Sequence, residues 1–175
     1  MQSRKLIRKS EFIAALPHIE NAEYLFRDLN DQLGLSKTLH YKAHAYWSIG
    51  VHSNNILEFC NEAISLAPPE RWSTYSGNLS IYLQEMGYHN EVLTLSDTLL
   101  PMFKEAQANL SEAYAVRAVS LHALQGDTQE IDTLINVALN EIRFLGQIDR
   151  QHVYQLALYL GALSQKQLAA CVVYA

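Results

Sequence analysis

The sequence predicts an all-α fold built from stacked helical hairpins. Apolar residues recur at helical spacing along most of the 175-residue chain, for example at Leu25, Leu29 and Leu33. Gly and Pro contribute only 7 and 4 residues, too few for the many tight turns of a β-sandwich. No segment alternates apolar and polar residues over the length of a strand, so we expect no sheet.

Breaker residues divide this periodic sequence into about nine helices. A helix ends where Gly can take the C-terminal cap or where Pro cannot continue the hydrogen-bond ladder. We therefore expect helix ends at Gly34, Gly50, Gly87, Gly126, Gly146, the pair Pro68-Pro69, and Pro101. The expected helices are Asn21–Leu33, Lys37–Ile49, one capped by Asn54 or Asn55, Trp72–Met86, Asn90–Leu100, Leu110–Gln125, Gln129–Leu145, Gln147–Leu163 and Ser164–Ala175.

The helix pairs repeat along the chain. Alignment on the turns gives two series of equivalent apolar residues, one on the first helix of each pair and one on the second. The first series is Ala43, Leu79, Ala118 and Leu156, and the second is Ile56, Val92, Ile131 and Ala169. Both series are spaced by 36, 39 and 38 residues. This period is typical of stacked helical pairs, each of which buries its apolar face against its neighbours. The residues that we expect to form the core are Leu79, Leu83, Val92, Leu95, Ala118, Leu121, Ile131, Leu134, Ile135, Leu156 and Leu160.

Three segments resemble the tetratricopeptide repeat (TPR) family. They are EMGYHNEVLTLSDTLLP around Gly87, LQGDTQEIDTLINVAL around Gly126, and ILEFCNEAISLAPP with Ala63 and Pro68. The resemblance covers residues 37–175. The units are longer than the family's ~34 residues. The first turn is one residue short, and the aromatic-Leu-Gly signature is missing from the second and third units. The sequence is similar to the divergent long repeats of bacterial regulators that sense peptides.

The resemblance implies one TPR-like α-α superhelix over residues 1–175. We expect about four helical hairpins, the last of them incomplete, after an N-terminal helical segment. The expected boundaries are 10–34 for that segment and 37–69, 72–104, 110–146 and 147–175 for the hairpins. The C-terminal helix is apolar at Val172, Val173 and Tyr174 and has no polar cap after it. Repeat arrays need such a cap, so we expect either a longer parent protein or a homodimer through this helix.

In TPR arrays the first helices line a concave groove that holds peptides, and the resemblance places a candidate site there. Lys42, Asn78 and Arg117 each precede the equivalent residue of the first series, and they resemble part of the family's carboxylate clamp. An Asn side chain both donates and accepts hydrogen bonds, as an extended peptide backbone requires. The two cations would bind an acidic group. The same groove is expected to include Tyr41, Ile81, Glu85, Ser120 and Tyr154.

Other function classes have little support in the sequence. A net charge of -5, with basic residues clustered only at Arg4 to Lys9, argues against binding nucleic acid. No apolar run reaches the ~20 residues of a membrane span. His40 and His44 have metal-ligand spacing but no identifiable third ligand, so no metal and no cofactor is expected. No nucleophile motif or phosphate-binding loop is present.

The sequence therefore favours a non-catalytic module that binds a protein or peptide. Unpaired cysteines and the lack of a secretory signal indicate the cytoplasm. A second interpretation is a sensory or dimerisation region of a larger bacterial signalling or transcription regulator. A third is an enzyme whose site is not recognisable from sequence.

Overall fold

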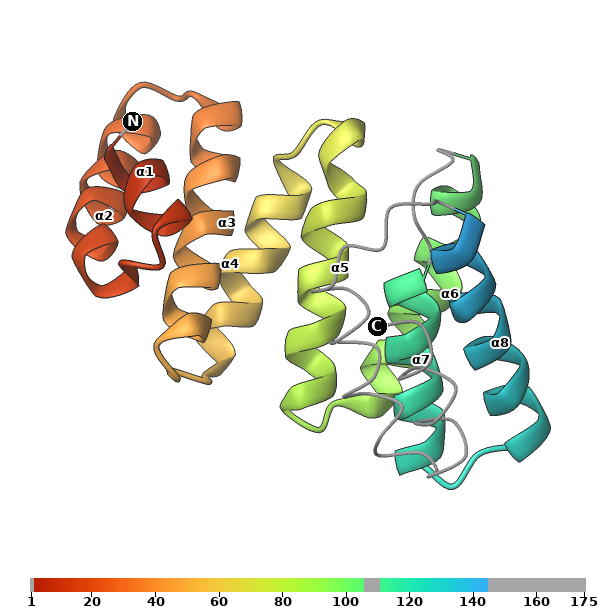
Figure 1. Cartoon of the computed structure of the whole chain (residues 1–175). Coiled ribbons are helices and arrows are strands. Elements are labelled where there is room, and N and C mark those ends of the chain that lie inside the picture. Colours follow the sequence, from red (N-terminus) through yellow and green to blue (C-terminus); the bar gives the residue numbers. More distant parts are fainter. Residues whose placement is uncertain (1, 106–110, 145–175) are drawn as a thin grey trace. The chain divides into compact units, whose positions relative to one another are not determined.

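The computed structural model describes residues 2–105 and 111–144, and these ranges contain eight helices and no strand (Figure 1). The predicted all-α fold is thereby confirmed. The chain divides into two compact units, Met1–Tyr82 and Leu83–Ala175, which are described separately. The helices are α1 (Gln2–Arg8), α2 (Phe12–Asp28), α3 (Gln32–Ser48), α4 (Asn54–Ser65), α5 (Pro69–Glu85), α6 (His89–Glu105), α7 (Ser111–Ala123) and α8 (Thr128–Phe144).

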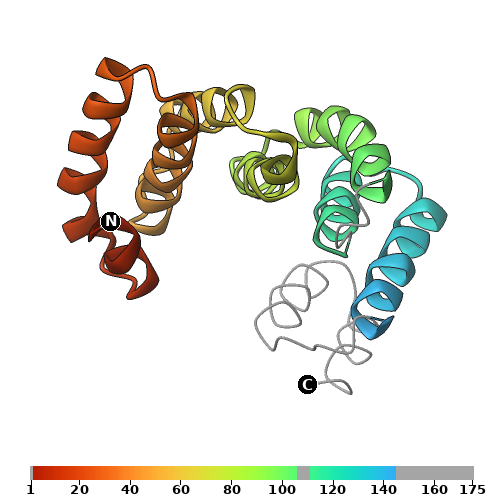
Figure 2. The same cartoon turned by 90° about the horizontal axis from the view of Figure 1, so that it is seen from above.

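In the first unit α2, α3 and α4 follow one another as neighbouring helices (Figures 1 and 2). The turn between α2 and α3 is short: Asn30 takes a left-handed conformation with φ of 52°, and Asp31 caps α3. The Asp31 carboxylate accepts a hydrogen bond of 2.9 Å from the backbone N–H of Gly34. The prediction that Gly34 ends a helix is therefore wrong, because Gly34 lies in the first turn of α3.

Gly34 instead allows α3 to approach α2 closely. A Cβ atom at this position would lie 2.5 Å from the Phe26 ring, a distance that side chains do not tolerate. This position does require glycine, but the reason is the close packing of α3 against α2 and not the end of a helix.

The other turns agree more closely with the sequence. Gly50 and Gly87 follow α3 and α5 with φ of 80° and 82°, as expected of glycines that terminate helices. In the turn after α7 the left-handed residue is Gln125, with φ of 57°, and not the expected Gly126. A Cβ atom at Gly126 would lie 3.1 Å from the Leu121 carbonyl oxygen, so this glycine also serves close packing.

Two proline positions differ from the sequence prediction. Pro69 begins α5 instead of only terminating the helix before it, because the first turn of a helix needs no N–H donor there. Pro101 was expected to end its helix, but α6 continues through it to Glu105. Pro101 is exposed, so its ring lies on the outer side of α6.

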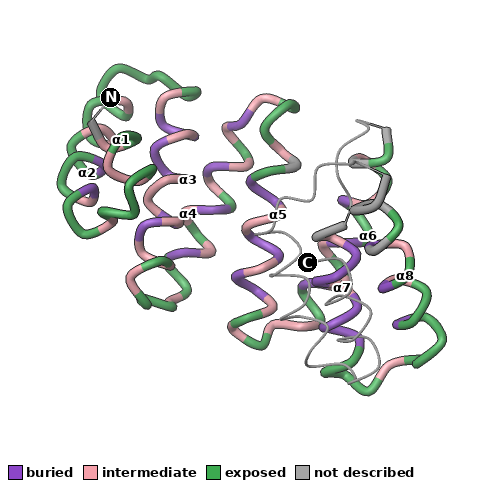
Figure 3. Tube along the Cα trace, viewed as in Figure 1, coloured by how far each residue is buried: buried purple, intermediate pink, exposed green. Residues whose placement is uncertain are grey.

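Two apolar clusters hold the first unit together. Ala15 and Ile19 of α2 pack against Ala45 of α3, with Leu6 and Ile7 of α1 covering them. The second cluster joins α3, α4 and α5 through Leu35, Leu39, Ala63, Ala67 and Tyr75. The buried positions recur along the facing sides of these helices in Figure 3.

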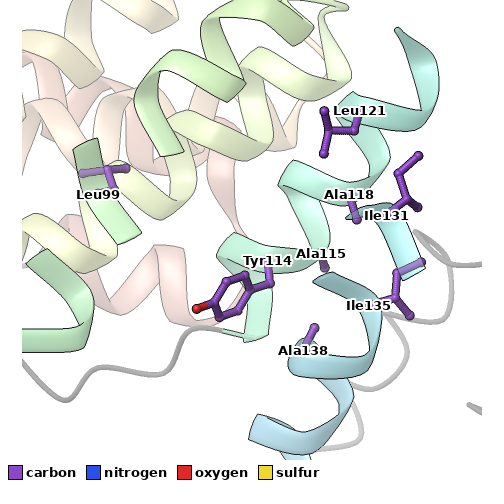
Figure 4. Packing of buried hydrophobic residues seen from close by; sticks show 8 residues of the cluster. All are labelled: Leu99, Tyr114, Ala115, Ala118, Leu121, Ile131, Ile135 and Ala138. Carbon is purple, nitrogen blue, oxygen red and sulfur yellow. The ribbon is translucent and has the colours of Figure 1, made fainter. Parts of the chain in front are cut away.

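The second unit has its own core between α6, α7 and α8, which Figure 4 shows. Seven residues expected to form the core of the repeats are buried: Leu79, Leu83, Val92, Ala118, Leu121, Ile131 and Ile135. Leu95 and Leu134 were also expected there but are half-buried at its edge. The expected core residues Leu156 and Leu160, and the apolar C-terminal helix, lie outside the described residues.

Candidate functional site

Lys42 of the predicted clamp is held in an ion-pair network inside the first unit. Its Nζ lies 2.7 Å from Glu23 of α2 and 4.4 Å from the centre of the Phe59 ring of α4. Arg27 extends the network by pairing with Glu23 at 3.0 Å and with Glu62 of α4 at 2.7 Å. Burial raises the pKa of Glu23, but hydrogen bonds from Lys42 and Arg27 outweigh it and hold that pKa below its usual value. Lys42 therefore links helices.

Arg117 of α7 has the same kind of environment in the second unit. Its guanidinium donates to Ser96 Oγ at 2.6 Å, to Asp97 Oδ1 at 2.7 Å and to the Leu93 carbonyl oxygen at 3.2 Å, all on α6. A further ion pair of 3.6 Å reaches Glu130 of α8. Only 16% of the Arg117 side chain is exposed. Like Lys42, it joins the helices on both sides of its own.

The agreement between these two residues follows the repeat. Lys42 and Arg117 occupy the same place in their units, directly before Ala43 and Ala118, and both pair with a carboxylate on the preceding helix. A long cation at this place bridges the stack of helices while its aliphatic stem covers apolar surface. Both cations are already paired with carboxylates of the chain. These contacts therefore do not support the predicted clamp for a peptide carboxylate, which stays a prediction.

Asn78, the third predicted clamp residue, differs from the two cations. It is half-buried on α5, and its side-chain amide makes no hydrogen bond with any residue in 2–105 or 111–144. It lies one helical turn after Tyr75 and one turn before Tyr82, so the three share a side of α5. An amide with no partner in the chain can still bind a peptide backbone.

The side of α5 that carries Asn78 meets α3 through stacked aromatic rings. The His40 ring lies 4.0 Å from the Tyr75 ring at an interplanar angle of 14°. The centre of the Trp47 ring lies 4.5 Å from that of Tyr82 and 3.8 Å from that of His52. We call these five residues the aromatic face. Lys42 points instead towards α2 and α4, so it is not part of this face.

The aromatic face offers both apolar area and polar groups. Tyr75 and Tyr82 are buried, whereas His40 and Trp47 are half-buried and His52 is exposed. His44, one turn after His40, packs edge-on against Phe12 at 5.4 Å and is also half-buried. Such a surface can hold a peptide by stacking and by hydrogen bonds, as rings with a polar tip do at binding sites.

The two histidines on α3 are held in their neutral form. Burial, together with the smaller effects of the nearby His44 and Arg71, lowers the pKa of His40 to about 4. Burial also lowers the pKa of His44. These shifts favour stacking of uncharged rings over a role for either residue as a proton carrier at neutral pH.

The free energy of unfolding is therefore expected to fall as the pH drops from about 6.5 to about 4. In this window an unfolded chain binds a proton at His40 that the folded chain excludes, so acid favours unfolding. His40→Phe keeps a ring against Tyr75 but does not titrate, and should reduce the fall by about 1–3 kcal/mol. Urea unfolding across this pH range measures the effect, and equal falls in both proteins would contradict it.

The remaining residues of the predicted groove are spread over different environments. Tyr41 and Ile81 are half-buried in the first unit, and Glu85 is exposed in the second. Ser120 was expected to line a groove but is fully buried, 3.4 Å from the ring of His89, so it has no surface to offer a ligand. Tyr154 lies outside the described residues.

Sequence reasoning missed most of the aromatic face. His40, Trp47, Tyr75 and Tyr82 are spaced by seven residues on two successive first helices, which is the signal that could have revealed them. The sequence analysis considers His40 only with His44, as possible metal ligands, and does not group it with the other rings. The prediction chose the neighbouring positions Lys42 and Arg117, which the fold uses to join helices.

The described residues, 2–105 and 111–144, contain no group of metal ligands and no membrane-spanning helix. No group of three or more His, Cys, Asp or Glu side chains comes together there as metal ligands would. None of the helices among those residues has the length and apolar character that crossing a membrane requires.

Comparisons with protein-family models, with curated proteins and with solved structures find no match to this chain. The interpretation of the site therefore rests on its own residues.

Proposed function

We propose that the chain is a non-catalytic, TPR-like binding module that holds an extended peptide or protein segment against the aromatic face of the first unit. The observation that carries the proposal is Asn78, a half-buried amide without a hydrogen-bond partner in the described ranges, on the side of α5 that carries Tyr75 and Tyr82. A peptide backbone offers an acceptor and a donor that can pair with the two groups of this amide. Stacking on Trp47 and His40 would add apolar contact.

The repeat supports the same proposal. The equivalent bridging cations Lys42 and Arg117, and the equivalent turn glycines Gly50 and Gly87, favour successive hairpins built on one plan. Such hairpins present a row of first helices, and rows of this kind form extended binding surfaces. The proposal assigns the cations to packing and the aromatic face to the ligand.

A random-sequence peptide library selected on the immobilised chain tests the proposal. The chain has two tryptophans. Trp47 stacks on Tyr82 in the aromatic face, whereas Trp72 donates its indole N–H to the Ala67 carbonyl oxygen. In a Trp72→Phe background the fluorescence therefore reports on Trp47 alone. Selected peptides should change this emission saturably. A library that yields no binder, or binders that leave the emission unchanged, would contradict the proposal.

A further inference from the structure

Two cations lie at the end of the aromatic face where α3 and α5 begin. Lys37 is half-buried on α3, and Arg71 is exposed in the first turn of α5. In contrast to Lys42 and Arg117, neither side chain forms an ion pair with any residue in 2–105 or 111–144. Glu70 precedes Arg71 in the sequence but does not pair with it. Within these ranges both charges remain unpaired.

The register of the stacked rings places the two cations at nearly the same level. His40 stacks on Tyr75 and Trp47 on Tyr82, so α3 and α5 run parallel with a constant offset of 35 residues (75−40 and 82−47). At this offset Arg71 lies one residue from the level of Lys37, which is about 1.5 Å along the helix axes. Both cations therefore precede the His40–Tyr75 stack by about one helical turn.

Both cations also lie on the side of the rings that faces away from α4. Leu39 of α3 packs against α4, and Lys37 lies about 160° around the helix from it. On α5, Trp72 packs against the same cluster, whereas Arg71 and Asn78 share a side about 100–120° from it. Lys37, Arg71 and Asn78 therefore border one surface, beside the aromatic face.

The charge of Arg71 acts on the nearest pair of rings. Burial lowers the pKa of His40, and Arg71 adds to this effect. Burial raises the pKa of Tyr75, and Arg71 opposes that effect. The positive charge is thus close to the His40–Tyr75 stack, so a ligand that lies on these rings can also reach Arg71.

We propose, on the basis of the function proposed above, that the extended segment at the aromatic face carries an acidic side chain. Its carboxylate pairs with Lys37 and Arg71 while Asn78 holds the backbone. Arg71 and Asn78 are seven residues apart on α5, or about 10 Å. An extended peptide covers this distance in about three residues. The ligand is therefore an acidic peptide, with Asp or Glu about three residues from the one that Asn78 binds.

The random-sequence library tests this inference when its peptides are fused through their C-termini, so that only side chains supply carboxylates. Binders that change the Trp47 emission in the Trp72→Phe background should share Asp or Glu at one position. Replacing that residue by Asn or Gln gives a neutral peptide of the same shape. It should bind about three- to tenfold more weakly, because two partly exposed ion pairs are lost.

Variants of the chain identify the cations. Arg71→Gln and Lys37→Gln should each weaken binding of the acidic peptide severalfold and leave binding of the neutral peptide unchanged. Arg71→Glu should prefer a peptide with Lys at the acidic position. Arg4→Gln is the matched control, because Arg4 is an exposed arginine of α1, a helix that packs mainly against α2. It changes the net charge equally and should not alter affinity. Circular dichroism verifies that each variant is folded.

The outcomes separate this inference from the proposed function. Binders that need Asn78, yet show no acidic preference and tolerate both cation variants, would overturn the inference and leave the proposed function standing. Equal losses in Arg71→Gln and Arg4→Gln would reveal a general effect of net charge and would also overturn it. A library without any binder would contradict the proposed function, and the inference would fall with it.

Discussion

Leu39→Ala is expected to lower the free energy of unfolding by about 2–5 kcal/mol. Leu39 has no exposed surface and belongs to the cluster that joins α3, α4 and α5. Its truncation removes apolar contact on three helices at once and leaves a cavity that close-packed neighbours cannot fill. Urea unfolding followed by circular dichroism measures the change.

Leu29→Ala provides the matched control for this substitution. Leu29 is the same residue type and directly follows α2, but it is 69% exposed. Its replacement should change the free energy of unfolding by no more than about 0.5 kcal/mol in the monomer. Similar losses in the two variants would mean that Leu39 is not the centre of the first unit.

Arg117→Met is expected to cost about 1.5–3 kcal/mol, because it removes charge-assisted hydrogen bonds at a largely buried position. Methionine preserves much of the aliphatic contact, so the loss reports on the guanidinium and its partners. The bonds to Ser96 and to the Leu93 carbonyl oxygen matter most, since Asp97 and Glu130 are 68% and 45% exposed and remain hydrated. Unfolding of the full chain measures this cost.

Two further substitutions sharpen this test. Arg117→Lys should lose part of the same free energy, because an ammonium cannot reproduce the forked geometry of guanidinium. Lys104→Met, an exposed cation on α6, should have no measurable effect. If Arg117→Met were as neutral as Lys104→Met, the equivalence of Arg117 with Lys42 as bridging cations would be refuted.

Much of the fold was predictable because the same pattern of apolar residues recurs in each unit of the repeat. Val92 and Ile131 are equivalent residues of successive units, and both are buried as the spacing predicted. The positions of Gly34 and Gly126 were harder to interpret. At Gly34 the missing side chain leaves room for the Phe26 ring, and this approach depends on how α2 and α3 pack. At Gly126 it leaves room for Leu121 at the end of α7.

The site was less predictable than the fold. The repeat places Lys42 and Arg117 at equivalent positions, but this register does not reveal whether a cation faces a ligand or a neighbouring carboxylate. Glu23 lies 19 residues before Lys42 on another helix, so their ion pair exists only after the helices pack. The stack of His40 on Tyr75 likewise depends on how α3 meets α5.

Binding through the aromatic face is tested most directly by titrating a library-selected peptide into wild type, Asn78→Ala and Asn61→Ala. Asn61 is the control because it is an exposed asparagine on α4. Loss of the Asn78 hydrogen bonds should weaken binding by about tenfold, and Asn61→Ala should leave affinity unchanged. Unchanged affinity in Asn78→Ala, or equal losses in both variants, would contradict a binding site at the aromatic face.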